Sequence, residues 1–200
     1  AGSATLAVQA SLIDIDGLLR SGASFQTPAG QAVALPGFAA MRFTSAGDIR
    51  LAAATAQSAA SAGSGYSGYS SFNTFGDLGF TAAQIYPITA APASGDFVSQ
   101  LALFTVSAAG PASVITFARN GVDLPPLPLS AGGQIRIIAP TINQGGVLRA
   151  PIGQITLGDP AHPGTSIINL LPGSVTSVSA AGALIPYGSP VGNNLYIYGT

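Results

Sequence analysis

Short segments of the chain alternate apolar and polar residues with a period of two, which is typical of a β-strand with one buried face. The clearest segments are 12–16, 48–51, 134–137 and 154–157. Clusters of Gly, Pro, Asn or Ser follow nearly all of them within a few residues, so each predicted strand ends in a turn. No stretch combines a sustained helical period with capping residues. The pattern therefore predicts an all-β protein.

One of these segments recurs at a fixed distance. The sequence Gly-Gln-Ile-Arg-Ile at 133–137 returns as Gly-Gln-Ile-Thr-Leu at 153–157, 20 residues later, and the sequence at 45–51 resembles 130–137 with one residue inserted. A unit this short cannot bury its apolar face alone, whereas stacked units bury a continuous core. We therefore predict a solenoid in which each coil pairs in parallel with the next.

The repeat also predicts a register. If 20 residues make one coil, Ile135 lies beneath Ile155 and Ile137 beneath Leu157, with all four side chains inside the coil. Gln134 should then stack on Gln154, and Arg136 on Thr156, on the outside of the coil. Gly133 and Gly153 should mark the same corner.

The composition supports strands and turns over helices. Only 6% of the residues are charged, against an average of about 25%. Lys and Glu, which favour helices, are absent, whereas Gly and Pro number 26 and 15. The absence of cysteine excludes disulfides and thiolate metal sites. The arginines are scattered and form no basic patch, so no nucleic-acid partner is expected. They are Arg20, Arg42, Arg50, Arg119, Arg136 and Arg149.

Some stretches depart from the pattern. Residues 52–71 are almost entirely Ala, Ser and Gly, which suits a low-complexity loop or tightly packed coils of small residues. Residues 81–123 are apolar but less regular, as in a side hairpin or flap. The uncharged run 97–118 is long enough to span a bilayer, but Gly110-Pro111 interrupts it, and we interpret it as two buried strands around a turn. Residues 1–10 lack a signal peptide, and we interpret them as a cut end within a larger protein.

Several motifs together resemble a known family. The sequence IIAPTINQGGVLRAPIGQITLG at 137–158, LPGSVTSVSAAG at 171–182, IPYG at 185–188 and AAQIYP at 82–87 are similar to segments of the filamentous-haemagglutinin family, large exoproteins of two-partner secretion systems. The resemblance covers most of the chain. It implies that residues 1–200 are a single segment of a larger exoprotein, folded as a right-handed parallel β-helix with irregular side loops or a flap.

The resemblance also implies a function. Members of this family form non-catalytic shafts that are secreted or displayed on the bacterial cell surface for adhesion. The implied partners are a receptor or glycan on a host or bacterial surface, an outer-membrane transporter during secretion, and the adjoining coils of the parent chain. No catalytic residue, cofactor or metal is implied.

Two other functions fit a β-helix. A polysaccharide-degrading enzyme would need three or more Asp with Arg or Lys on one face of the solenoid. Asp14 and Asp16 lie two apart, so both face one side of a strand, where they could help to bind Ca²⁺ or act as an acid/base pair. The simpler interpretation, which we favour, is that Ile13 and Ile15 point inward and the aspartates face water. The remaining acids are scattered at Asp48, Asp77, Asp96, Asp123 and Asp159. A self-assembling filament subunit is the other alternative, because a solenoid has two open ends.

The remaining candidates are weaker. Residues 63–68, Gly-Ser-Gly-Tyr-Ser-Gly, fit a dinucleotide-binding pattern by letter, but no strand precedes them and no helix follows. His162, the only histidine, lies in a proline-rich turn, and no nucleophile motif accompanies it. A cluster of aromatic residues could bind a sugar or protein, or could anchor a loop on the shaft. Its members are Tyr66, Tyr69, Phe72 and Phe75.

Overall fold

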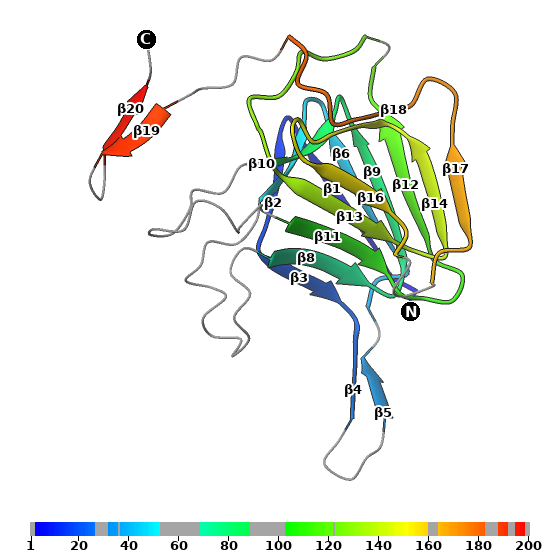
Figure 1. The fold of residues 1–200 in the computed structure, drawn as a ribbon. Helices are drawn as coiled ribbons and strands as arrows, with labels where there is room; N and C mark the ends of the chain where they lie inside the picture. Colours follow the sequence, from blue (N-terminus) through cyan, green and yellow to red (C-terminus); the bar gives the residue numbers. More distant parts are fainter. Residues whose placement is uncertain are drawn as a thin grey trace.

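A computed structural model describes residues 3–26, 32–35, 37–52, 69–88, 103–121, 123–159, 164–182, 188–191 and 195–198. The described residues contain no helix, and therefore none that is long and apolar enough to cross a membrane. Most of the strands belong to three parallel sheets that enclose one core (Figure 1). This arrangement is a parallel β-helix, as predicted.

The sheets are named A, B and C in the order in which the chain first enters them. Sheet A contains β1 (Thr5–Ala10), β6 (Ala40–Ser45), β9 (Asp77–Ala82), β12 (Val114–Arg119), β14 (Thr141–Gly145) and β17 (Ile167–Leu170). Sheet B contains β2 (Ile13–Asp16), β7 (Ile49–Ala52), β10 (Ile85–Ile88), β15 (Val147–Arg149) and β18 (Val175–Ser177). Sheet C contains β3 (Leu18–Ser21), β8 (Tyr69–Thr74), β11 (Leu103–Ala108), β13 (Gln134–Ile138) and β16 (Gln154–Leu157).

Each turn of the coil visits the sheets in the order A, B, C. The first three turns follow this rule, from β1-β2-β3 to β9-β10-β11. In the fourth turn the described residues pass from β12 to β13 without a strand in sheet B. The fifth turn, β14-β15-β16, is complete, and the sixth consists of β17 and β18. Two antiparallel hairpins complete the strands, β4 (Ala23–Gln26) with β5 (Ala32–Leu35) and β19 (Gly188–Val191) with β20 (Leu195–Tyr198).

The core is built from columns of inward-facing side chains. In sheet A, the parallel register places Phe43 beside Phe80 and Phe80 beside Phe117, and their rings stack with centroids 5.5 and 5.4 Å apart. Phe72 from sheet C meets Phe43 edge-on at 5.4 Å. Because adjacent strands lie about 4.8 Å apart, identical aromatic residues in successive turns can stack almost in parallel. The phenylalanine column therefore ties three turns together.

The predicted 20-residue coil is confirmed. Strands β13 and β16 pair in parallel, with Ile135 beside Ile155 and Ile137 beside Leu157. Both residues of β13 are buried, and both residues of β16 pack against the same core. Gly153 lies directly against the Gly133 carbonyl, where any side chain would clash.

The third copy of the repeat was placed wrongly. Ile49 lies in sheet B, whereas Ile135 lies in sheet C, so 45–51 and 130–137 belong to different faces. The two segments share a strand pattern but not a position in the turn.

The two irregular stretches lie partly in the coil and partly outside the described residues. Of residues 52–71, Ala52 ends β7 and residues 69–71 begin β8, while 53–68 lie outside the described residues. Of residues 81–123, the described parts run through all three sheets, and 89–102 and 122 lie outside the described residues. The predicted turn at Gly110-Pro111 lies between β11 and β12.

The register predicts how two neighbouring positions differ in their effect on stability. Ile135→Asp places a carboxylate in the core and should lower the free energy of unfolding by about 3–5 kcal/mol. Gln134→Ser, on the outer face of the same strand, should change it by no more than about 0.5 kcal/mol. Urea denaturation measures both, and equal losses would contradict the inward and outward assignment.

Candidate functional site

Two groups of charged and polar side chains meet at sheet B. Asp14, Arg50 and Tyr86 lie side by side on the outer faces of β2, β7 and β10. Arg50 donates from Nε and Nη2 to the two carboxylate oxygens of Asp14, at 2.6 and 2.5 Å. These bonds lower the pKa of the Asp14 carboxyl and raise the pKa of Arg50. Burial, with the Asp48 carboxylate nearby, raises the pKa of Tyr86.

A second group lies deeper in the same sheet. Gln84 donates from Nε2 to Asp48 Oδ2 at 3.2 Å and to the Pro126 carbonyl at 3.1 Å. Arg149 donates from one Nη to Gln84 Oε1 and to the Pro125 and Pro126 carbonyls, at 2.9, 2.9 and 3.0 Å. The side chain of Arg149 is buried, which lowers its pKa, and its Nε has no hydrogen-bond partner. We call the six side chains of the two groups the sheet B cluster.

The second group of the cluster lies where the fourth turn lacks its strand. In that turn the chain crosses sheet B as an irregular segment, residues 123–130, which we call the strap. Strands β10 and β15 pair through only one residue pair, Ile85 with Leu148. Three prolines in the strap have no N–H to satisfy and favour an extended backbone in the residues before them. The strap therefore leaves carbonyl groups free, and Gln84 and Arg149 bind two of them.

One edge of the strap faces the core and the other faces solvent. Pro128 and Ser130 are buried, and the Ser130 hydroxyl donates to the Pro87 carbonyl at 2.5 Å. Leu124 and Leu129 are 56% and 76% exposed. The buried Pro128 and Ser130 fix the strap on the coil and thereby hold the two exposed leucines in place.

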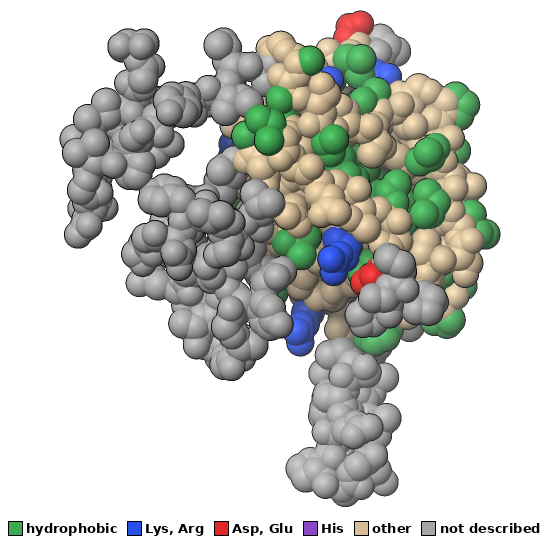
Figure 2. Space-filling view, viewed as in Figure 1, with side chains coloured by type: hydrophobic (Ala, Val, Ile, Leu, Met, Phe, Trp, Pro, Cys, Tyr) green, Lys and Arg blue, Asp and Glu red, His purple; other side chains and the backbone are tan. Residues whose placement is uncertain are grey.

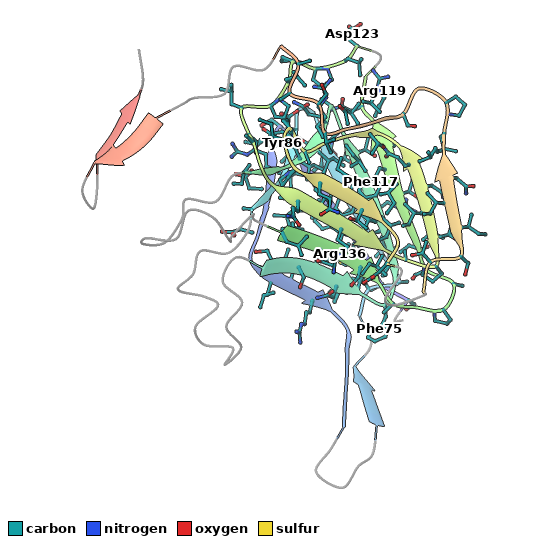
Figure 3. The ribbon with its side chains drawn as sticks, in the orientation of Figure 1. Phe75, Tyr86, Phe117, Arg119, Asp123 and Arg136 are labelled. Carbon is teal, nitrogen blue, oxygen red and sulfur yellow. The ribbon has the colours of Figure 1, made fainter. Side chains whose placement is uncertain are left out.

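The other charged groups are dispersed. Figure 3 shows Arg136 and Tyr86 on different sides of the coil, on sheets C and B. Arg136 lies 4.0 Å from Asp159, and Arg119 donates to the Gly173 carbonyl at 3.3 Å. The face drawn in Figure 2 accordingly shows few charged side chains among polar and apolar ones.

The predicted aspartate pair has the expected orientation. Asp14 and Asp16 are exposed, and Ile13 and Ile15 are buried in the core. Asp14 is held by Arg50. Among the described residues, no three acidic or histidine side chains converge in a way that could hold a metal ion.

The structure brings together acids that the sequence separates. Asp14, Asp16 and Asp48 all lie at sheet B, with Arg50 and Arg149. Three Asp with Arg on one face of the solenoid is the feature expected of a polysaccharide-degrading enzyme. The positions of these acids along the chain did not indicate that they would meet. However, Asp14 accepts both hydrogen bonds of one arginine, and Asp48 accepts from Gln84. Two of the three carboxylates are therefore engaged by neighbouring side chains.

The structure places the other candidate residues at unrelated positions or does not describe them. His162, Asp96, Tyr66 and residues 63–68 lie outside the described residues. Phe72 is buried in the core between Phe43 and Phe80, which excludes it from a surface binding platform, one of the two interpretations of this aromatic cluster. The four other candidates take structural positions in or beside the coil: Tyr69 begins β8, Phe75 is half-buried, Asp77 accepts from the Val114 N–H, and Asp123 is exposed on the strap.

Sequence analysis missed the buried polar side chains. Gln84, Gln144 and Arg149 are buried, and each binds backbone carbonyls of another turn or of the strap. Their own residue types are those expected on an exposed face, and Arg149 lies in a run in which residues 146–151 are all buried, so alternation does not mark it as buried. The Leu-Pro-Pro-Leu-Pro-Leu sequence at 124–129 was the available signal for the missing strand.

Comparison of the chain with protein-family models, with curated proteins and with solved structures finds no match. The coil and the sheet B cluster are therefore the observations on which a function can be argued.

Arg149→Met should test the anchor of the strap. Methionine keeps most of the apolar stem but leaves the Pro125 carbonyl without its donor and the Pro126 carbonyl with Gln84 as its remaining donor, so the free energy of unfolding should fall by about 2–3 kcal/mol. Hydrogen exchange at Leu124, Leu127 and Leu129 should accelerate.

The matched control is Arg50→Met. It removes an arginine from an exposed ion pair, which should cost no more than about 1 kcal/mol. Unchanged exchange in the strap of the Arg149 variant would contradict the role assigned to this side chain.

Proposed function

We propose that this chain is a structural, non-catalytic shaft of a surface-displayed or secreted adhesin of the filamentous-haemagglutinin type. The observation that carries the proposal is the continuous stack of turns around one apolar interior. In sheet A one inward column passes through Leu6, Met41, Leu78, Ile115 and Ile142, without a polar residue. Such a stack resists bending because each turn is hydrogen-bonded along its strands to the next.

The polar side chains support the same function. Gln144 donates to the Val175 carbonyl and to Thr176 Oγ1 in the next turn, at 3.0 and 3.1 Å. Asn169 donates to Asn143 Oδ1 at 2.8 Å, again across one turn. These bonds join one turn to its neighbour, and none of them orients a nucleophile. They suit a rod better than an active site.

The outer surface is suited to contact with other surfaces. With 6% charged residues in the chain, the coil lacks the dense charge that keeps most soluble surfaces apart. We propose a receptor or glycan on a host or bacterial surface as the partner, and an outer-membrane transporter as the route of secretion.

Surface display can be tested directly. An antibody raised against the folded chain should label intact cells of the source bacterium or bind its culture supernatant. The signal should be lost when the outer-membrane transporter is deleted. Labelling that requires permeabilised cells, together with an empty supernatant, would overturn the proposal. An antibody against a cytoplasmic protein of the same cells is the control for leakage.

A polysaccharide-degrading enzyme is the second candidate, favoured by the gathering of three aspartates and two arginines at sheet B. On our first proposal, purified chain should release no reducing ends from a panel of acidic and neutral polysaccharides. Release that Asp14→Asn or Asp16→Asn abolishes, while Asp77→Asn on sheet A leaves it intact, would favour the enzyme instead.

A further inference from the structure

One side chain at the corner between sheets A and B joins turns that are not neighbours. Asn120 follows β12 in the fourth turn, and its backbone N–H donates to the Ala82 carbonyl of the third turn at 3.2 Å. Its side chain reaches the second turn, where Nδ2 donates to the Ser45 carbonyl at 2.6 Å and to the Ala46 carbonyl at 2.8 Å. The carboxamide nitrogen of Asn120 therefore ties the fourth turn to the second.

The residue that follows makes this carboxamide chemically reactive. Of the asparagines in the chain, Asn120 is the one that a glycine follows. Without a side chain beside it, the Gly121 nitrogen can attack the Asn120 Cγ and form a five-membered succinimide. The N–Cγ bond forms, the Cγ–Nδ2 bond breaks, and the proton of the Gly121 nitrogen leaves with Nδ2 as ammonia. Water then opens the ring to aspartate or isoaspartate, so the reaction needs no other reagent.

The surroundings leave the Gly121 nitrogen open to this reaction. Asn120 and Gly121 are both exposed. A Cβ at Gly121 would meet no heavy atom within 4 Å, and the φ of this residue is not in the left-handed region. Within the part of the chain that the structure describes, no group accepts a hydrogen bond from the Gly121 N–H. The hydrogen bonds of the Asn120 carboxamide are therefore what opposes ring closure.

This corner lies well inside the coil. It belongs to the second, third and fourth turns, with β1 on one side in sheet A and β14 and β17 on the other. Figure 3 shows Arg119 and Asp123, the labelled neighbours of the pair, at the upper edge of the coil. The site therefore does not depend on what adjoins either end of the coil.

We propose that Asn120-Gly121 is a self-modification site, at which the chain converts Asn120 to aspartate or isoaspartate when this corner opens. Ring closure turns the carboxamide toward the Gly121 nitrogen and breaks both of its hydrogen bonds to the second turn. The change is one-way, because a carboxylate has no N–H to donate and its oxygens would lie against two carbonyl oxygens. The tie between the second and fourth turns is then lost.

Mass spectrometry of the intact chain follows the conversion of amide to acid, and peptide mapping assigns its position. In mildly alkaline buffer, Asn120 should convert before the other asparagines. Because two hydrogen bonds must break first, the folded chain should react about ten- to a hundredfold more slowly than the chain unfolded in urea.

Gly121→Ala is the matched control for the chemistry. The added methyl group hinders the attacking nitrogen and should slow conversion about tenfold, in the folded and the unfolded chain alike. Since the space around Gly121 is open, the fold should not change. An unchanged melting temperature checks this.

The consequence for the corner is tested with two substitutions of the same residue. Asn120→Ala removes the donor, whereas Asn120→Asp also places a carboxylate against the Ser45 and Ala46 carbonyls. Hydrogen exchange of the backbone N–H at position 120 should accelerate about tenfold in the Ala variant, and further in the Asp variant.

Four results would contradict the proposal. Conversion that begins at another asparagine would remove the site. Equal rates in the folded and unfolded chain would show that the two hydrogen bonds do not restrain the side chain. A folded chain that reacts more than about a thousandfold more slowly would show that the corner opens only with the whole coil. Unchanged exchange in the Asn120→Asp variant would show that the modified corner stays closed.

Discussion

The structure depends on parallel pairing in register between turns whose inward strand positions are mostly apolar. Parallel pairing places equivalent residues of successive turns directly above one another, about 4.8 Å apart. An inward residue therefore meets an inward residue at every step, as in the column of Phe43, Phe80 and Phe117. A shift of one residue in one strand would turn its apolar side chains to water and expose the neighbouring turns. The connections between strands do not have to stack in register, so their lengths can vary.

The corners are constrained by the approach of the backbones. Gly153 lies against the carbonyl of Gly133, and Gly76 and Gly110 lie against backbone carbonyls of the turns below them. A Cβ at these positions would meet main-chain atoms that cannot move without breaking the ladder. Glycine is therefore required at these corners for its size, whatever the length of the connection that precedes it. This requirement explains how turns of very different length stack on one axis.

The sequence predicted the parts of the fold that follow from this constraint. The repeat at 133–137 and 153–157 predicted the pairing of the two strands, their register and the corner glycines correctly. The reason is that the 20 residues from one copy to the next make one complete turn of the coil, without a long inserted loop. The match at 45–51 failed because alternation specifies a strand but not which of three faces receives it. The sequence left two interpretations open for Phe72 because a low-complexity stretch precedes it, whereas its own strand is part of the core. The sheet B cluster could not be predicted, since Asp48, Gln84 and Arg149 are brought together only by stacking of turns.

The strap shows how a coil of this kind tolerates an interruption. Without a strand in the fourth turn, β10 and β15 would leave their facing backbone groups and the buried side chains between them without partners. Prolines reduce this problem because they present carbonyls but no N–H groups. Gln84 of the third turn and Arg149 of the fifth turn bind those carbonyls, and the Asp48 carboxylate accepts a hydrogen bond from Gln84. A buried arginine is unfavourable by itself, and its Nε remains without a partner, so its buried position beneath the strap follows from the carbonyls that it binds. The group of Asp48, Gln84 and Arg149 is therefore explained by the missing strand, and its position at sheet B needs no bound ligand to account for it.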